Sequence, residues 1–264
     1  MPEGDTVYQA ASRLRRALAG ATLDHCDFRV PKLATIDLTG RRVGAVRSVG
    51  KHLFIDIDAA DDGAPPSSIH SHLKMEGTWD VHRLGQRWRR PTFQARIILR
   101  ANGYEAVGAN LGILELTTDP DHCVAHLGPD LLADDWDRAE ALHRLAADPD
   151  RPVGLALLDQ RVMAGVGNVY RSEICFLART PPTRPVEQTN TEQIVDLARR
   201  LLWDNRNRPA RSTTGQAAPH ARTWVYGRAG RLCRRCATVI EQGRLSDTAT
   251  DADRVVYYCP RCQR

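Results

Sequence analysis

The sequence predicts an α+β protein of several domains, with a leading helix and an antiparallel β-sandwich, then a helical domain, then a C-terminal four-cysteine β-hairpin. Three observations support this prediction. Short segments alternate apolar and polar residues between 21 and 107, the apolar period becomes 3.6 residues after Pro129, and four of the seven cysteines crowd the C-terminus. We expect domains at 1–125, 126–222 and 223–264.

The first domain is predicted to begin with a helix and to continue as strands. Asp5 is the expected N-cap and Gly20 the expected stop of the helix. Its apolar stripe consists of Val7, Ala11, Leu14 and Leu18. Asn102-Gly103 lies between two apolar segments and predicts a β-hairpin. The other expected strands are 21–29, 41–49, 52–58, 68–73 and 92–100, with a surface loop at 61–67.

Four helices are predicted in the second domain. Asp134 or Asp135 is the expected cap of the first, and Pro152 begins the second at a position that tolerates proline. The third covers 166–178 and the fourth 191–205, with a proline-rich joint at 180–185 between them. The stretch that follows Asn205 has no apolar period and predicts a connecting segment.

Positive charge is concentrated at the C-terminal end. The chain of 264 residues carries a net charge of +5, but residues 205–264 contain 12 arginines and only four acidic residues, a local charge of +8. This distribution is typical of a module that binds a polyanion. The sequence has no long apolar run, and its start is too acidic for a signal peptide, so we expect a cytoplasmic protein.

The C-terminal cysteines have the spacing of a metal site. Cys233 and Cys236 form one Cys-x-x-Cys pair and Cys259 and Cys262 form a second, and two such pairs complete a tetrahedral all-sulfur site of the kind that zinc prefers. Two disulfides are the alternative, which reducing conditions in the cytosol disfavour. One structural Zn²⁺ is therefore predicted to hold the hairpin, and residues 246–253 within it have the composition of an acidic, flexible loop.

The first residues of the chain offer a nucleophile. If Met1 is removed, Pro2 presents a secondary amine next to the carboxylate of Glu3. A terminal amine titrates near pH 8, so a fraction of it is neutral and nucleophilic at neutral pH. An ordinary exposed terminus is the alternative interpretation.

Two further segments suggest contacts to phosphate. Gly165-Val166-Gly167 precedes a predicted helix and exposes backbone N–H groups, to which Asn168 can add its amide; a simple turn between two helices is the alternative. Lys51 lies on a turn into an apolar strand, where a lysine is either a solvated edge residue or a cation aimed at a cleft.

The segment from His70 to Gly77 has two interpretations. His70 and His72 point to the same face and suggest a metal, but satisfied polar histidines are favoured because no third ligand is evident. Met75 is either a core residue or a wedge that fills a gap in a base stack.

In combination these motifs resemble the formamidopyrimidine-DNA glycosylase and endonuclease VIII family of base-excision-repair enzymes, and the resemblance spans the whole chain. The motifs that carry it occur in the family's order: Pro2-Glu3-Gly4, Gly50-Lys51, His72-x-x-Met75-x-Gly77, Leu127-Gly128-Pro129-Asp130, the helix-two-turn-helix segment from Leu158 to Asn168, and the four-cysteine finger with Arg254 before its third cysteine.

The resemblance implies a role for each of these residues. Pro2 attacks C1′ of a damaged nucleotide and forms a Schiff base, Glu3 assists as acid and base, and Lys51 and Arg254 bind flanking phosphates and assist proton transfer. The damaged base is flipped out of the duplex, and Met75 with Lys74 fills the space. The remaining DNA contacts are assigned to His126, Gly165, Gly167 and Asn168. The implied partner is damaged DNA, bound by a monomer that associates with the nucleoid and needs no membrane.

Two absences favour the endonuclease VIII branch, and hence oxidised pyrimidines. Only residues 206–223 separate the last helix from the finger, where the formamidopyrimidine branch has a longer loop over an oxidised purine, and residues 107–111 lack that branch's Arg-x-Phe wedge. An oxidised-purine glycosylase is the alternative within the family. From a different class, a non-catalytic zinc-finger DNA-binding protein is the second alternative, although it has no need of Pro2-Glu3.

Overall fold

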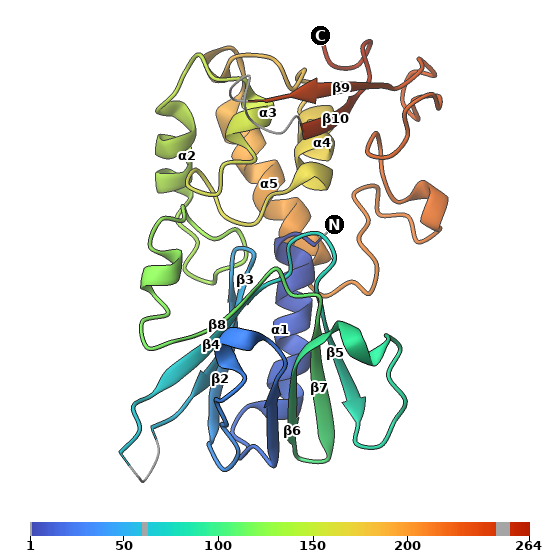
Figure 1. Ribbon diagram of the computed structural model, residues 1–264. Helices are drawn as coiled ribbons and strands as arrows, with labels where there is room; N and C mark the ends of the chain where they lie inside the picture. Colours follow the sequence, from blue (N-terminus) through green and yellow to red (C-terminus); the bar gives the residue numbers. More distant parts are fainter. Residues whose placement is uncertain (1, 60–62, 247–253) are drawn as a thin grey trace. The chain divides into compact units, whose positions relative to one another are not determined.

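A computed structural model describes residues 2–59, 63–246 and 254–264 (Figure 1). The chain divides into two compact units, Met1–His126 and Leu127–Arg264. This division falls next to the boundary expected at residue 125, whereas a separate domain from residue 223 onward stays a prediction. Of the loop predicted at 61–67, residues 63–66 form a mostly exposed connection and Ser67 already begins a strand, whereas 61–62 lie outside the described residues, as do residues 247–253 of the loop predicted at 246–253.

The first unit begins with helix α1, Gly4–Leu18, whose N-cap is Glu3. The prediction that Asp5 caps this helix is wrong, because Asp5 already lies in its first turn, one residue inside the start. Val7, Leu14 and Leu18 are buried, as the apolar stripe predicts. The helix ends at Leu18, and Gly20 follows with φ +78°, a conformation that glycine adopts without strain.

Two four-stranded antiparallel sheets form the predicted sandwich. One has the strand order β1-β6-β7-β5 and the other β2-β3-β4-β8. The strands are β1 His25–Phe28, β2 Val43–Val49, β3 His52–Ile57, β4 Ser67–His72, β5 Thr78–Arg83, β6 Ala95–Ala101, β7 Tyr104–Ala109 and β8 Ile113–Thr117. Asn102 and Gly103 both have positive φ, as the predicted two-residue hairpin turn requires. Strands β5 and β8 were not predicted from the sequence.

The core of this unit lies between the sheets and includes α1. Leu14 of the helix, Leu53 and Ile55 of β3, and Leu99 of β6 all belong to one buried apolar cluster. Strand β3 therefore turns residues 53, 55 and 57 inward. By alternation, His52 and Phe54 lie on the opposite face of the sheet, where the ring of His70 stacks on both.

The described residues of the second unit form four α-helices: α2 Arg138–Ala146, α3 Val153–Ala156, α4 Asn168–Leu177 and α5 Thr191–Asn205. The bounds of α5 are those predicted, and Asn190 caps it by accepting a hydrogen bond from the Gln193 N–H. The prediction that Asp134 or Asp135 caps α2 is wrong. Asp137 does so, because its carboxylate is the one placed to accept from the Glu140 N–H.

The four-cysteine hairpin belongs to this second unit. Its strands β9, Glu241–Leu245, and β10, Arg254–Tyr258, pair antiparallel, and β10 lies against α4. A small apolar cluster of Phe176, Val225 and Ile240 supports it together with the cysteines. The preceding connection is also fixed, because the buried Asn205 amide donates to the Ser212 carbonyl and accepts from the Ser212 N–H.

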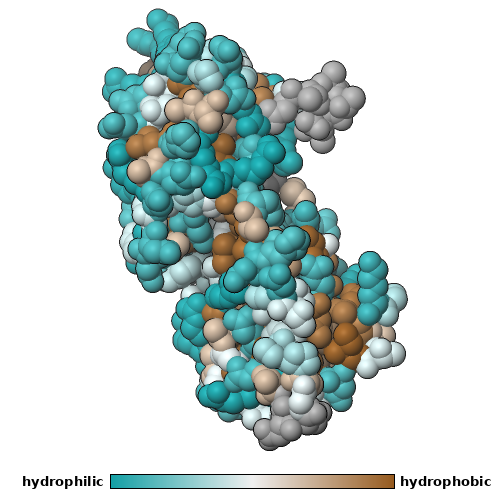
Figure 2. Space-filling view, turned by 90° about the vertical axis from the view of Figure 1, so that its left-hand side faces the viewer, coloured by the Kyte–Doolittle hydropathy of each residue, from teal (hydrophilic) through white to brown (hydrophobic). Residues whose placement is uncertain are grey.

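The surface in Figure 2 is mostly hydrophilic, with apolar side chains gathered in small groups, one of them on the N-terminal unit. Among the described residues, no helix combines the length and the apolar character that crossing a membrane would need.

Candidate functional site

The N-terminal motif lies at the start of α1. Pro2 is half-buried and Glu3 is fully buried. The Glu3 carbonyl accepts hydrogen bonds from the N–H groups of Thr6 and Val7, which fixes the backbone of the motif onto the first turn. A buried carboxylate thus lies next to the position that becomes the chain's amine when Met1 is removed.

Lys51 lies in the two-residue turn between β2 and β3. Val49 and His52 pair across this turn, and Gly50 has φ +57° at its first central position, which a side chain would strain. The turn therefore places Lys51, half-buried, at one end of the sheet.

Histidines next to this turn are neutral. Burial, together with the neighbouring His72 and His70, lowers the pKa of His52 to about 3. Burial and the charges of Lys74 and Lys51 lower the pKa of His72 to about 4. The His72 Nδ1 accepts from the Lys74 N–H at 2.9 Å, so Nε2 carries the hydrogen and can donate it. Two lysines and a neutral donor thus meet here, an arrangement that suits a phosphate.

The Leu73–Gly77 loop presents Met75 to solvent. Met75 is 63 % exposed, which contradicts the core interpretation of this residue and leaves the wedge interpretation. The loop is tight, because the Gly77 N–H donates to the Leu73 carbonyl and a Cβ at Gly77 would lie 2.4 Å from that oxygen. Lys74 is exposed at its tip with φ +50°. His126, also exposed, places its ring centroid 6.1 Å from that of His52.

In the second unit, the glycine turn leads into α4 as predicted. Gly165 has φ +116°, and Gly167 is the N-cap. Gln160 closes the turn: its amide donates to the carbonyls of Leu158 and Val166 and accepts from the Gly165 N–H. Asn168 is the first residue of the helix, and its Oδ1 is buried without a hydrogen-bond partner among the described residues.

Asp159, in the same turn, forms two ion pairs. Its Oδ2 lies 2.7 Å from Arg161 Nη2 and 2.9 Å from Arg151 Nη1. These hydrogen bonds, that of Arg161 first, hold the pKa of Asp159 below its usual range. A carboxyl group whose pKa is lower in the folded state contributes stability in full above its unfolded-state pKa. This contribution is lost as the pH falls from there through the folded-state pKa.

We therefore expect Asp159→Asn to lower the free energy of unfolding by about 1–2 kcal/mol at neutral pH, allowing for screening of the exposed Arg161. The difference from the native chain should shrink as the pH is lowered to about 3. Urea unfolding at both pH values measures it, with the exposed Asp135→Asn as the control. A difference that stays constant with pH would contradict the assignment.

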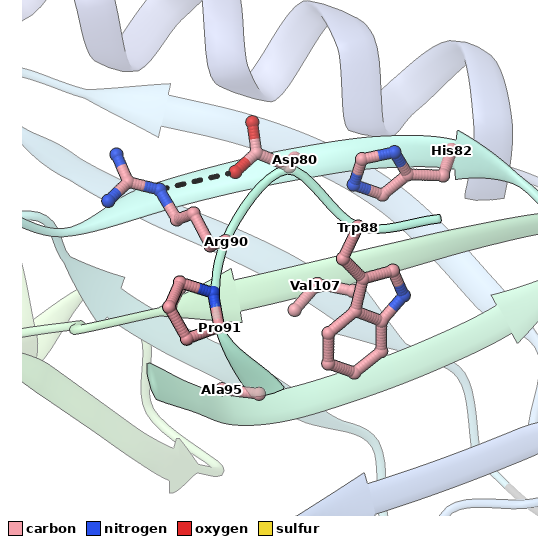
Figure 3. Close-up of a pocket in the computed structure, with 8 residues that line it drawn as sticks. Asp80, His82, Trp88, Arg90, Pro91, Ala95 and Val107 are labelled. Carbon is pink, nitrogen blue, oxygen red and sulfur yellow. Dashed lines mark ion pairs between the residues drawn. The ribbon is translucent and has the colours of Figure 1, made fainter. Parts of the chain in front are cut away.

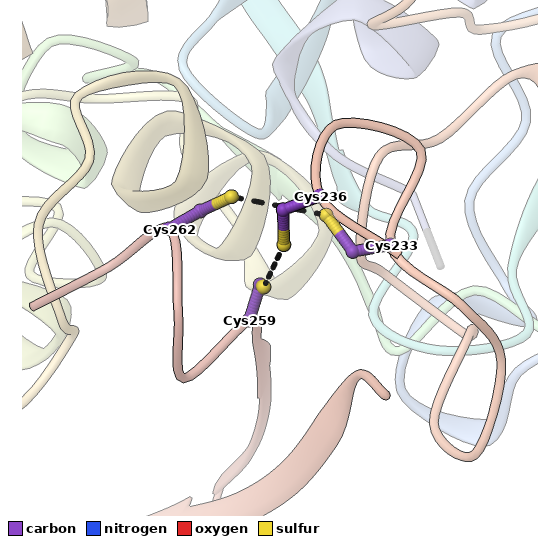
Figure 4. A group of neighbouring side chains, drawn as sticks. All are labelled: Cys233, Cys236, Cys259 and Cys262. Atoms are coloured by element: carbon purple, nitrogen blue, oxygen red, sulfur yellow. Dashed lines mark hydrogen bonds between the residues drawn. The ribbon is translucent and has the colours of Figure 1, made fainter. Parts of the chain in front are cut away.

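The four cysteines converge as their spacing predicts (Figure 4). Their sulfur atoms lie within 4.8 Å of one another, with Cys236–Cys259 at 3.5 Å and Cys233–Cys262 at 3.9 Å. A tetrahedral Zn²⁺ with Zn–S bonds of about 2.3 Å needs sulfur atoms about 3.8 Å apart. The cluster therefore fits a structural zinc, and its four ligands leave no position for water.

Arg254 begins β10 with an exposed side chain, and its backbone is held by a buried arginine. Arg171 of α4 donates through Nη2 to the carbonyls of Arg254 and Val255, at 3.4 and 2.6 Å. Glu173, also buried on α4, accepts from the N–H groups of Trp224, Val225 and Tyr226, the segment that leads into the finger. One helix thus carries both the glycine turn and the two side chains that dock the hairpin.

A small pocket lies on the outer face of the sheet formed by β5, β6 and β7 (Figure 3). Trp88 covers a floor of Ala95 and Val107, and Arg90 pairs with Asp80 at 3.6 Å at its edge. None of the predicted site residues lines it.

Within the first unit, Lys51 and Lys74 both lie close enough to His72 for their charges to lower its pKa. The ring of His126 lies close to that of His52, the residue that follows Lys51. Within the second, one helix connects Gly167, Asn168 and the backbone of Arg254. The sequence did not indicate Gln160, Arg171 or Glu173 as supports. For Arg171 and Glu173, the only signal was a polar residue inside the apolar helix α4.

A Pro-Glu helix that leads a β-sandwich, a glycine turn that opens a helix, and a four-cysteine hairpin together define the architecture of a helix-two-turn-helix DNA glycosylase. Comparisons with known proteins agree. Residues 1–110 match the formamidopyrimidine-DNA glycosylase N-terminal domain, and residues 127–203 match the formamidopyrimidine-DNA glycosylase H2TH domain.

Full-length relatives are more specific. The chain is 51 % identical to Endonuclease 8 2 of Mycobacterium bovis over all of both chains. It is also 51 % identical to the DNA-(apurinic or apyrimidinic site) lyase Nei2 of Mycolicibacterium smegmatis, over all of this chain and 99 % of that one. A Lactococcus lactis Fpg structure, in complex with DNA containing an abasic site, has the same fold, with a TM-score of 0.79 at 22 % identity over 99 % of both chains. The chain therefore belongs to the formamidopyrimidine-DNA glycosylase and endonuclease VIII family, whose members are DNA glycosylases and lyases.

Proposed function

We propose that this chain is a bifunctional DNA glycosylase and lyase that acts through Pro2 on oxidised bases, pyrimidines in particular. The observation that carries the proposal is the Pro2-Glu3 pair, with a buried carboxylate at the start of α1. The positive end of a helix disfavours a neighbouring cation, so this position favours the neutral, nucleophilic form of the Pro2 amine.

The reaction divides into two steps. The Pro2 nitrogen forms a bond to C1′ while the glycosidic bond breaks, and the base leaves with the proton that the Pro2 nitrogen gives up. Glu3 then donates a proton to the sugar ring oxygen as the ring opens and the iminium forms. The resulting iminium acidifies the C2′ proton, whose loss breaks the C3′–O bond and releases the 3′ phosphate. Water then hydrolyses the Schiff base and regenerates Pro2.

The remaining site residues are proposed to hold the DNA. Lys51 and Arg254 bind phosphates that flank the lesion, as do Gly165, Gly167 and Asn168 at the helix start. The exposed Met75, with Lys74 beside it, fills the space left by the flipped base, and His126 contacts the same strand. A structural Zn²⁺ on Cys233, Cys236, Cys259 and Cys262 keeps the Arg254 hairpin folded. The enzyme is proposed to work as a monomer in the cytoplasm, associated with the nucleoid.

Preference for oxidised pyrimidines is supported by the short 206–223 connection, by the absence of an Arg-x-Phe wedge at 107–111, and by similarity to proteins named Endonuclease 8 2. A lesion panel tests it: thymine glycol and hydroxyuracil against 8-oxoguanine and formamidopyrimidine, in duplex and single strands. Faster excision of the oxidised purines would instead support the alternative, an oxidised-purine glycosylase of the same family.

A non-catalytic DNA-binding protein would need the finger but not the nucleophile. Whether the chain is a glycosylase or only a DNA-binding protein, we expect Arg254→Ala to weaken DNA binding several-fold. The slope of log K against log salt should also fall in magnitude by about 0.9, the value for one phosphate contact. Fluorescence anisotropy over a salt series measures both. Arg16→Ala, which removes an exposed arginine of α1, is the control for net charge. An unchanged slope in Arg254→Ala would exclude its phosphate contact.

A further inference from the structure

His70 meets two other metal-ligand side chains on the polar face of the β2-β3-β4-β8 sheet. Glu115 of β8 lies directly opposite His70 of β4 in the strand register. Cys123 belongs to the short 3₁₀ helix His122–Val124, which follows β8. One ligand atom from each of the three residues lies within 4.8 Å of the others.

The three groups are already in contact. The His70 Nδ1 lies 2.6 Å from Glu115 Oε1, and the Cys123 Sγ lies 3.9 Å from the same oxygen. His70 is 3 % exposed, whereas Glu115 and Cys123 are partly open to solvent. The cluster thus has a fixed, buried side and an accessible side, by which an ion can enter.

We propose that His70, Glu115 and Cys123 form a second Zn²⁺ site, separate from the four-cysteine finger. Imidazole nitrogen, carboxylate oxygen and thiolate sulfur are the three ligand types that zinc accepts, and three protein ligands leave one position for water. One carboxylate and one thiolate balance the charge of the ion, so binding leaves no net charge next to the buried imidazole.

The imidazole of His70 has the support that a metal ligand needs. Phe54 stacks on it, with ring centroids 4.7 Å apart and planes 11° from parallel, and its Nε2 lies 2.8 Å from His52 Nδ1. Histidines that bind a metal usually donate their other ring N–H to a fixed acceptor, and His52 Nδ1 can accept here.

Binding rearranges the hydrogens in a defined way. Without metal, Glu115 can only accept, so His70 Nδ1 carries the hydrogen and Nε2 accepts from His52 Nδ1. With Zn²⁺ on Nδ1, the His70 hydrogen moves to Nε2 and is donated to His52 Nδ1, and the His52 hydrogen moves to its own Nε2. Each ring exchanges one N–H for the other in this rearrangement, and the Cys123 thiol releases its proton as the sulfur binds the ion.

The test is metal stoichiometry on the full chain, purified with its finger zinc and equilibrated with micromolar free Zn²⁺. We expect two zinc ions per chain, against one in Cys123→Ser and one in Glu115→Gln. His122→Ala, which removes an exposed neighbour of Cys123, is the matched control and should retain two. One zinc per chain in the unaltered protein, or two in Cys123→Ser, would overturn the proposal.

Alkylation gives a second measurement at a single residue. Zn²⁺ should slow the reaction of the Cys123 thiol with iodoacetamide at least tenfold, as followed by peptide mass spectrometry, and Glu115→Gln should abolish most of this protection. An alkylation rate that does not respond to zinc would refute the site. Neither measurement depends on enzymatic activity, so the results of both are independent of the proposed function.

Discussion

A chain with two extra residues in front of Pro2 should lose borohydride trapping on an abasic-site oligonucleotide by about 10³-fold or more. The extension converts the Pro2 amine into an amide nitrogen, which cannot attack C1′ or form an iminium. The fold should not change, because α1 begins only after Glu3 and the core residues of the helix start at Val7. Gel analysis of the covalent adduct, with strand cleavage in the same samples, measures the effect.

Controls separate loss of the nucleophile from loss of binding. The extended chain should keep its affinity for abasic DNA within a few-fold, whereas Lys51→Ala should weaken binding and leave some trapping at saturating DNA. Glu3→Gln keeps the amine and should slow base removal more than adduct formation on a pre-formed abasic site. Undiminished trapping in the extended chain, together with loss of trapping in Lys51→Ala, would show that Lys51 and not Pro2 is the nucleophile.

The parts of the fold that were predicted from the sequence are those with strong local signals. Asn102-Gly103 specified its hairpin because the turn needs two positive φ values, and the bounds of α5 were predicted because its apolar period is regular. Strand β8 was missed for the opposite reason. Thr117 and the other residues of β8 are all partly exposed, so that strand lacks the buried alternation that marks the others.

Cap positions were less readable than helices. Asp5, Asp134 and Asp135 were all chosen as caps because aspartate prefers that position, but the backbone places Glu3 and Asp137 there instead. Propensity identifies which residues can cap a helix, whereas tertiary packing decides where the first turn begins.

The same contrast holds for the sites. The cysteine pairs were recognised from spacing because each pair binds from one tight turn. His70 is 45 residues from Glu115 in the chain, and strand pairing and the 3₁₀ helix after β8 bring it together with Glu115 and Cys123. The absence of an evident third ligand was therefore a property of local sequence and not of the fold.

Cys236→Ser should remove the tightly held zinc and unfold the finger while leaving the helices of the same unit intact. The apolar cluster under the hairpin is small, consisting mainly of Phe176, Val225 and Ile240 besides the cysteines. A core of this size cannot offset the entropy of ordering the hairpin, whereas structural zinc supplies about 10–16 kcal/mol in small fingers. Affinity for DNA should fall by about 100-fold, because Arg254 and its neighbours lose their fixed positions.

Hydrogen exchange locates the change. In Cys236→Ser the backbone amides of β9 and β10 should exchange fast, whereas those of α5 should keep their protection. Cys123→Ser is the matched control: it removes a thiol outside the finger and should keep one tightly held zinc and native DNA affinity. If Cys236→Ser still holds one chelator-resistant zinc and binds DNA normally, the metal does not maintain the Arg254 hairpin, and its order must come from Arg171 and Glu173 of α4 alone.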